Sequence, residues 1–156
     1  MLKFIDLFAG TGGIRLGFEQ AAAELDIKTE CVFSSEIDKK ASESYKLNFG
    51  EDPLCDVTKV SASDIPDFDV MLAGFPCQAF SYAGKRKGFT DTRGTLFFDV
   101  ERILKEKKPK YFLLENVRGL TTHDKGRTFE TIMNALKSIG YSVDYLLLNS
   151  SNFDVP

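Results

Sequence analysis

The sequence predicts an α/β fold in which a mostly parallel sheet carries helices on both faces. Short apolar runs typical of strands alternate along the chain with longer segments of helical periodicity. The 156 residues are enough for one domain with a substantial core. A composition of 43% hydrophobic and 28% charged residues is typical of a globular protein. We therefore expect a single domain over residues 1–156.

The first strand and helix are joined by a glycine-rich turn. Residues 2–8 form a short apolar strand, residues 9–13 (AGTGG) the turn, and a helix follows from Ile14 to about residue 25. Glycines allow close backbone approach to a ligand, and a helix N-terminus offers free N–H groups. The dinucleotide fingerprint fails because Arg15 stands where its third glycine should be. The pattern predicts a nucleotide-type binding turn and does not favour a pyrophosphate; a merely tight connection is the alternative.

An acidic residue follows the second strand. Residues 31–35 form that strand, and Glu36 comes directly after it, roughly 20 residues beyond the glycine turn. A carboxylate at this point is well placed to accept hydrogen bonds from a ribose diol. The alternative is a capping role, although Asp38 is the expected cap of the next helix, residues 39–48.

A short third strand is expected over residues 54–58. Asp56, near its end, could accept an exocyclic amino group such as that of adenine. The alternative is that Asp56 caps a short helix, a role that Ser61 or Ser63 could also fill.

The fourth strand, residues 68–73, leads to a cysteine. Gly74 ends the apolar run, and Pro76 forbids further ladder pairing, so Cys77 lies just past the carboxyl end of the strand. Ligands bind at this edge of open α/β sheets. A thiol attacks only as thiolate, and its ordinary pKa is about 8.5. The alternative is a small buried apolar residue.

Residues 78–94 show neither helical nor strand periodicity. Loops of this length inside compact domains are usually functional or disordered. Glycines divide the segment, and basic and aromatic residues alternate along it: Lys85, Arg86, Lys87 and Arg93, with Phe80, Tyr82 and Phe89. We predict a mobile arm that grips a polyanion; a solvated basic turn is the alternative.

A second acid is expected beside the cysteine. A helix over residues 95–108 precedes the fifth strand, residues 110–114, which ends at Glu115. If an apolar pocket kept Glu115 protonated, it could donate a proton to a substrate ring; a structural carboxylate bonded to backbone amides is the alternative. A helix over residues 127–139, closed by Gly140, and a sixth strand over 141–148 follow.

Hydrophobicity, cysteine and histidine counts and net charge argue against several classes of protein. No apolar stretch approaches the roughly 20 residues of a membrane span, and the N-terminus lacks the plan of a signal peptide. Three cysteines without a C-x-x-C spacing predict reduced thiols in a cytoplasm, and with a single histidine they argue against a zinc site. Because the net charge is −3, any surface for nucleic acid must be locally positive.

Taken together, the motifs resemble those of the DNA (cytosine-5)-methyltransferases, the bacterial modification methylases in particular. Residues 6–13 (DLFAGTGG) are similar to the family's cofactor-loop motif and residues 74–81 (GFPCQAFS) to its nucleophile motif. Residues 84–97 are similar to its catalytic loop and the helix that follows, and residues 115–117 (ENV) to its acid motif. All four occur in order and at the right spacing. The resemblance implies a Rossmann-like fold of the S-adenosylmethionine-dependent methyltransferases.

The resemblance also implies site residues. S-adenosylmethionine would be the cofactor, with Glu36 on its ribose and Asp56 on its adenine edge. The positions similar to those that line the family's cofactor pocket are Phe8, Gly10, Gly13, Glu36, Asp56, Val57, Pro76 and Leu96. The implied catalytic residues are Cys77 and Glu115. Those implied to contact double-stranded DNA are Gln78, Ser81, Lys85, Arg86, Lys87 and Arg93.

The implied reaction begins with addition of the Cys77 thiolate to carbon 6 of cytosine, because carbon 5 alone is too poor a nucleophile to take a methyl group. Glu115 would stabilise the developing charge at ring nitrogen 3. The target base must leave the stack, with residues 78–94 closing over it.

The resemblance departs at the C-terminal end. The family continues with a Gln-x-Arg-x-Arg strand, a target-recognition region and closing motifs, none of which is present in residues 1–156. We therefore expect a companion chain or a missing segment, a weak or inactive catalyst in isolation, and an exposed sheet edge at residues 141–148. A role in a restriction-modification system is implied. The alternatives are a non-catalytic cofactor-binding or partner-docking fragment, and an RNA cytosine-5 methyltransferase.

Overall fold

The structure is a computed structural model, and it describes residues 1–76 and 96–153. The chain divides into two compact units, Met1–Asn116 and Val117–Pro156, which are considered separately. Within the described residues, no helix combines the length and the apolar character that a membrane span requires.

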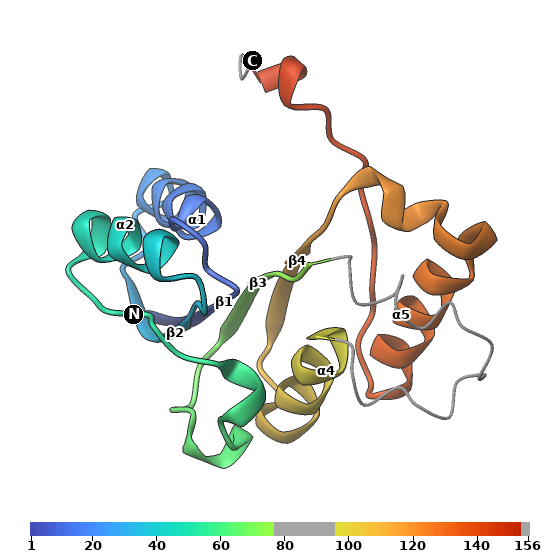
Figure 1. Ribbon diagram of the computed structural model, residues 1–156, viewed down its shortest axis with the longest axis horizontal. Coiled ribbons are helices and arrows are strands. Elements are labelled where there is room, and N and C mark those ends of the chain that lie inside the picture. The colour runs from blue at the N-terminus through green and yellow to red at the C-terminus, as the bar shows by residue number, and fades with distance from the viewer. Residues whose placement is uncertain (77–95, 154–156) are drawn as a thin grey trace. The chain divides into compact units, whose positions relative to one another are not determined.

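The first unit is built on a parallel sheet, as predicted, and this sheet has four of the six expected strands (Figure 1). The strands are β1 (Leu2–Leu7), β2 (Thr29–Ser35), β3 (Val70–Gly74) and β4 (Tyr111–Glu115). Their spatial order is β2-β1-β3-β4, and every neighbouring pair is parallel. The carboxyl ends of all four strands therefore lie along one edge of the sheet.

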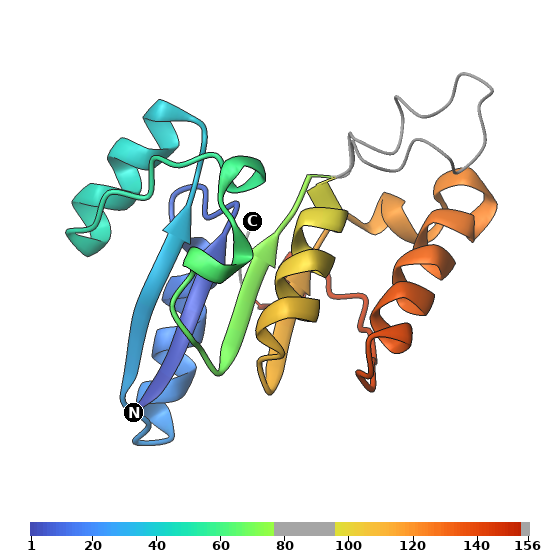
Figure 2. The same ribbon diagram turned by 90° about the horizontal axis from the view of Figure 1, so that it is seen from below.

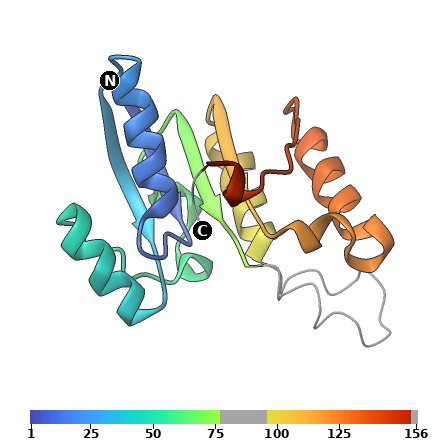
Figure 3. The same cartoon turned by 90° about the horizontal axis from the view of Figure 1, so that it is seen from above.

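Helices cover both faces of this sheet. Helix α1 (Gly13–Glu24) lies on one face and α4 (Leu96–Lys107) on the other (Figures 2 and 3). Helix α2 (Lys39–Phe49) follows β2. The helical spacing seen in the sequence of α4 marks its buried face: Phe97, Val100, Ile103 and Leu104.

The core continues from the strands into the helices. On the α1 face, Phe4, Val70 and Leu72 form a buried cluster against which Ile14 and Phe18 of α1 pack. Strands of a parallel sheet are buried on both faces and therefore contain nearly continuous apolar runs. Residues 4–7 of β1 are buried, and the exception to their apolar character is Asp6, an acidic residue that is only 1% exposed.

The predicted third strand, residues 54–58, is wrong. Only one isolated parallel bridge joins Leu54 to Glu36. The chain then turns into a short 3-10 helix (Val57–Lys59), because the Asp56 side chain accepts a hydrogen bond from the Thr58 backbone N–H at 3.1 Å and caps its start.

In the second unit, short 3-10 helices (Arg118–Thr121 and His123–Gly126) lead into α5 (Arg127–Ser138), close to the predicted bounds. Gly140 follows α5 in the left-handed region (φ +101°). The predicted strand over 141–148 is wrong, and so is the sheet edge expected there: the structure shows no ladder in residues 141–149. An apolar pattern makes a strand only where a neighbouring strand completes its hydrogen bonds. Tyr145 instead packs its ring on Phe129 of α5, with ring centroids 4.8 Å apart.

Candidate functional site

A pocket of about 260 Å³ opens beside the carboxyl ends of the strands in the first unit. Six of the residues assigned to a cofactor from the sequence line it: Phe8, Glu36, Asp56, Val57, Pro76 and Leu96. They come from five separate segments of the chain, so the fold gathers them at one place. Gly10 and Gly13 belong to the neighbouring turn and do not line the pocket.

The glycine turn is held from two sides. The backbone N–H of Gly10 donates to Oε2 of Glu36 at 2.7 Å. On the other side, the Asn48 amide donates to the carbonyl oxygen of Thr11 at 3.0 Å. Gly12 has φ +93°, and a Cβ there would overlap the Phe49 ring, so this position requires glycine for its conformation and for space.

The Glu36 carboxylate accepts two backbone hydrogen bonds, and its ribose-binding role stays a prediction. One carboxylate oxygen accepts from Gly10, and the other accepts from the backbone N–H of Asp38 at 2.7 Å. Asp38 is the cap of α2, as predicted, accepting from the Ala41 N–H at 2.8 Å. Because each carboxylate oxygen can accept a second hydrogen bond, Glu36 retains the capacity to bind a diol.

Asp56 has the capping role that was the alternative interpretation. The Thr58 hydroxyl donates to its Oδ1 at 2.7 Å, and Lys59 lies 3.2 Å from Oδ2. These contacts, the Thr58 hydrogen bond first, lower the pKa of Asp56 below its ordinary value. The pocket therefore has an ionised acceptor on its rim, and its contact with an adenine edge stays a prediction.

The tips of β3 and β4 are joined beside the pocket. Gly74 and Glu115 are register partners, and a Cβ on Gly74 would lie 3.3 Å from Oε2 of Glu115. The Asn116 amide donates to the Phe75 carbonyl oxygen at 2.6 Å. The segment that leads to Cys77 is thereby fastened to the strand that carries the acid.

Glu115 itself is exposed, so the described residues do not form the apolar pocket that was expected to keep it protonated. The reason is that Tyr111, Leu113 and Glu115 alternate along the exposed face of β4. Cys77 and the predicted DNA contacts lie outside the described residues: Gln78, Ser81, Lys85, Arg86, Lys87 and Arg93.

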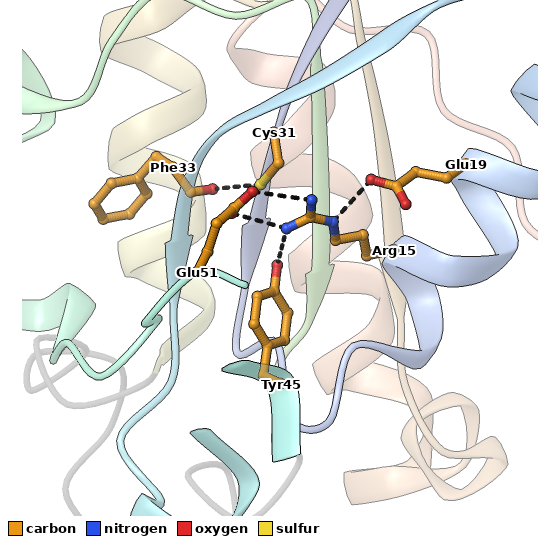
Figure 4. Close-up of polar contacts among 6 residues, drawn as sticks. All are labelled: Arg15, Glu19, Cys31, Phe33, Tyr45 and Glu51. Carbon is orange, nitrogen blue, oxygen red and sulfur yellow. Dashed lines mark hydrogen bonds and ion pairs between the residues drawn. The ribbon is translucent and has the colours of Figure 1, made fainter. Parts of the chain in front are cut away.

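Sequence reasoning missed an ionic cluster centred on the buried Arg15 side chain (Figure 4). The guanidinium is bidentate on Glu51, at 2.9 and 3.1 Å, and donates to Glu19 at 2.8 Å and to the Tyr45 hydroxyl at 2.9 Å. It also lies over the Phe49 ring, 4.2 Å from the centroid. The i, i+4 spacing of Arg15 and Glu19 was readable from the sequence, whereas the partners from α2 and beyond were not.

Asp6 lies near this cluster, and neither of its carboxylate oxygens has a hydrogen-bond partner among the described residues. Burial raises the pKa of Asp6 to about 7, while the Arg15 guanidinium and the Tyr45 hydroxyl offset part of that effect. The sequence offered one indication of this buried acid, because Asp6 interrupts an otherwise apolar run in β1. Within residues 1–76 and 96–153 as a whole, no group of three or more His, Cys, Asp or Glu side chains could hold a metal ion.

The known proteins to which the chain is similar are described as methylases or methyltransferases. The family model described as C-5 cytosine-specific DNA methylase matches residues 2–156. The chain is 64% identical to the Type II methyltransferase M.BanI of Aneurinibacillus aneurinilyticus and 68% identical to M.HgiCI of Herpetosiphon aurantiacus. It is covered over 99% and 100% of its length, respectively, and spans 36% of each of these relatives.

Among solved structures, the Dnmt2 methyltransferase of S. pombe superposes with a TM-score of 0.64 at 26% identity. The match covers 86% of this chain and 42% of that one. The chain thus spans well under two thirds of the proteins that it resembles.

Proposed function

The chain belongs to the C-5 cytosine-specific DNA methylase family, and we propose that it supplies the cofactor pocket and the attacking thiol of an enzyme that methylates carbon 5 of cytosine in DNA. S-adenosylmethionine is the methyl donor of this family. The observation that carries the proposal is one pocket that is lined by six of the residues assigned to the cofactor from the sequence.

The lining of the pocket fits the chemistry of this cofactor. Glu36 offers carboxylate oxygens to a ribose diol, and the ionised Asp56 offers an acceptor to an exocyclic amino group. Between them, Phe8, Val57 and Leu96 provide apolar surface for the faces of an adenine ring. When bound, the cofactor supplies an electrophilic methyl group on a sulfonium.

The reacting groups follow the tips of β3 and β4. Cys77, three residues past the end of β3, attacks carbon 6 of cytosine as thiolate, and this addition makes carbon 5 nucleophilic. Glu115 acts in its acid form and donates its proton to ring nitrogen 3, where negative charge develops. After methyl transfer, carbon 5 loses its proton and the Cys77 sulfur leaves, which restores the aromatic ring. The register pairing of Gly74 with Glu115 supports this arrangement.

The base must leave the helical stack to reach these groups, since the thiolate and the methyl donor approach carbons 6 and 5 from the faces of the ring, and stacking covers both faces in a duplex. We assign the closing of the site to residues 78–94, and phosphate contacts to the basic side chains of that segment: Lys85, Arg86, Lys87 and Arg93. Sequence reading in the major groove is assigned to polypeptide outside residues 1–156, and the greater length of M.BanI and M.HgiCI supports this.

The test is methyl transfer from labelled S-adenosylmethionine to duplex DNA by the full-length polypeptide. Cys77→Ser should abolish transfer. Cys31→Ser, in β2 and outside the pocket lining, should retain it. In a duplex that contains 5-fluorocytosine, carbon 5 has no proton to lose, so a denaturation-resistant protein–DNA adduct should form and should require Cys77. Transfer by Cys77→Ser, or transfer to RNA alone, would contradict the proposal.

A further inference from the structure

The Arg15 cluster has no part in the chemistry above. Arg15 is only 6% exposed, and charged side chains are rarely buried unless they are paired. A buried ion pair does not by itself show that the fold is more stable. Arg15 also occupies the first turn of α1, directly after the glycine turn. Arg15 is therefore placed where its ion pairs can affect the glycine turn.

The partners of Arg15 join two helices. Tyr45 and Phe49 belong to α2, and Glu51 follows that helix. The fork geometry of the guanidinium matches the carboxylate of Glu51 through two parallel hydrogen bonds. Glu19 is different, because it lies one turn further along α1 itself. Arg15 therefore fastens the start of α1 to the end of α2.

The end of α2 is also what touches the glycine turn. Phe49 fills the space beside Gly12, and Asn48 holds the Thr11 carbonyl oxygen. Any movement of the end of α2 would therefore be passed directly to the turn. At the other end of α2, Asp38 is bonded to Glu36, whose second oxygen holds Gly10.

We propose that Arg15 is a positioning residue for the cofactor turn, acting through α2. It keeps Phe49 and Asn48 against residues 11 and 12 while Glu36 holds residue 10 from the pocket side. A turn held at both sides loses little further freedom when a ligand binds, and pre-organisation of this kind strengthens binding. This inference rests on the proposed function, because it takes the pocket to be that of S-adenosylmethionine.

The two acidic partners of Arg15 provide a matched pair of variants. Glu51→Gln weakens the connection between the helices, while Glu19→Gln removes a carboxylate from the same guanidinium within one helix. Neither glutamate lines the pocket. A merely stabilising role for the cluster would make the two variants similar in their effect on cofactor binding.

The measurement is the dissociation constant of S-adenosylmethionine by titration calorimetry on the full-length polypeptide, together with kcat and KM for methyl transfer and the melting temperature. For Glu51→Gln we expect roughly tenfold weaker binding, a similar rise in cofactor KM and an unchanged kcat, since a neutral amide with one acceptor oxygen replaces a charged, bidentate partner of the guanidinium. For Glu19→Gln we expect a change of less than about twofold, as for an ordinary i, i+4 pair. Arg15→Lys, which keeps the charge without the fork, should behave like Glu51→Gln.

Equal dissociation constants for the two glutamine variants would overturn the inference, as would a fall in melting temperature for Glu51→Gln with no change in cofactor binding. If the unmodified protein binds no S-adenosylmethionine, the proposed function is wrong, and the inference about Arg15, which rests on it, is wrong as well. The two failures are therefore distinguishable.

Discussion

The burial of Asp6 predicts an unusual dependence of stability on pH. Its carboxyl group is 1% exposed, and desolvation raises its pKa to about 7 in the folded chain, against an ordinary value of 3.8. Below pH 4, Asp6 is neutral whether the chain is folded or unfolded. Between pH 4 and 7 only the unfolded chain releases the proton, so the free energy of unfolding should fall as the pH rises. Above pH 7 the full effect is present.

The size of this effect follows from the two pKa values. Each factor of ten in an ionisation constant is worth about 1.4 kcal/mol, so a rise from 3.8 to about 7 corresponds to about 4 kcal/mol at pH 8. Asp6→Asn has nearly the same shape and stays neutral at every pH. Relative to the unmodified protein, Asp6→Asn should therefore gain about 3 kcal/mol between pH 4.5 and pH 8, because about 1 kcal/mol of the effect is already present at pH 4.5.

Urea denaturation at half-unit pH intervals measures this difference directly. Any penalty from placing an amide at position 6 is constant with pH. The pKa of Asp6 therefore determines only how the difference in the free energy of unfolding between the two proteins changes with pH. Asp69→Asn is the control. Asp69 accepts a hydrogen bond from the Lys3 backbone N–H, which lowers its pKa, so its contribution is lost only in more acidic solution. If the difference between Asp6→Asn and the unmodified protein is the same at pH 4.5 and pH 8, the reasoning about burial is wrong.

Three further predictions concern the site. Gly12→Ala should destabilise the fold by about 1–3 kcal/mol in thermal unfolding and weaken S-adenosylmethionine binding, because its φ is +93° and a Cβ would overlap Phe49; unchanged binding would contradict this. Asn116→Ala, which removes the donor to the Phe75 carbonyl oxygen, should lower kcat for methyl transfer roughly tenfold while the cofactor dissociation constant stays the same. Glu36→Gln should weaken cofactor binding roughly tenfold by calorimetry, because a neutral amide cannot accept from both backbone N–H groups; an effect confined to kcat would argue against its assigned role.

The sequence predicted most elements because their signals are local. The apolar spacing of α4 and the capping role of Asp38 depend on residues within a few positions of each other, and both are confirmed. Residues 54–58 were mistaken for a strand because apolar residues surround Asp56, whose side chain turns the chain instead. The strand expected over 141–148 failed because a strand depends on a partner that an apolar pattern does not contain.

The sequence by itself determined the family, the parallel α/β class, and the residues that follow the ends of β2 and β3. Through the family resemblance, it also assigned Glu36 and Asp56 to one cofactor pocket, which both of them line. Only the tertiary structure decided that Arg15 is paired with Glu51, 36 positions away, and that Asp6 is buried near it. The physical reason is that pairing and desolvation of charges depend on which distant segments pack together, and local periodicity carries no record of that packing.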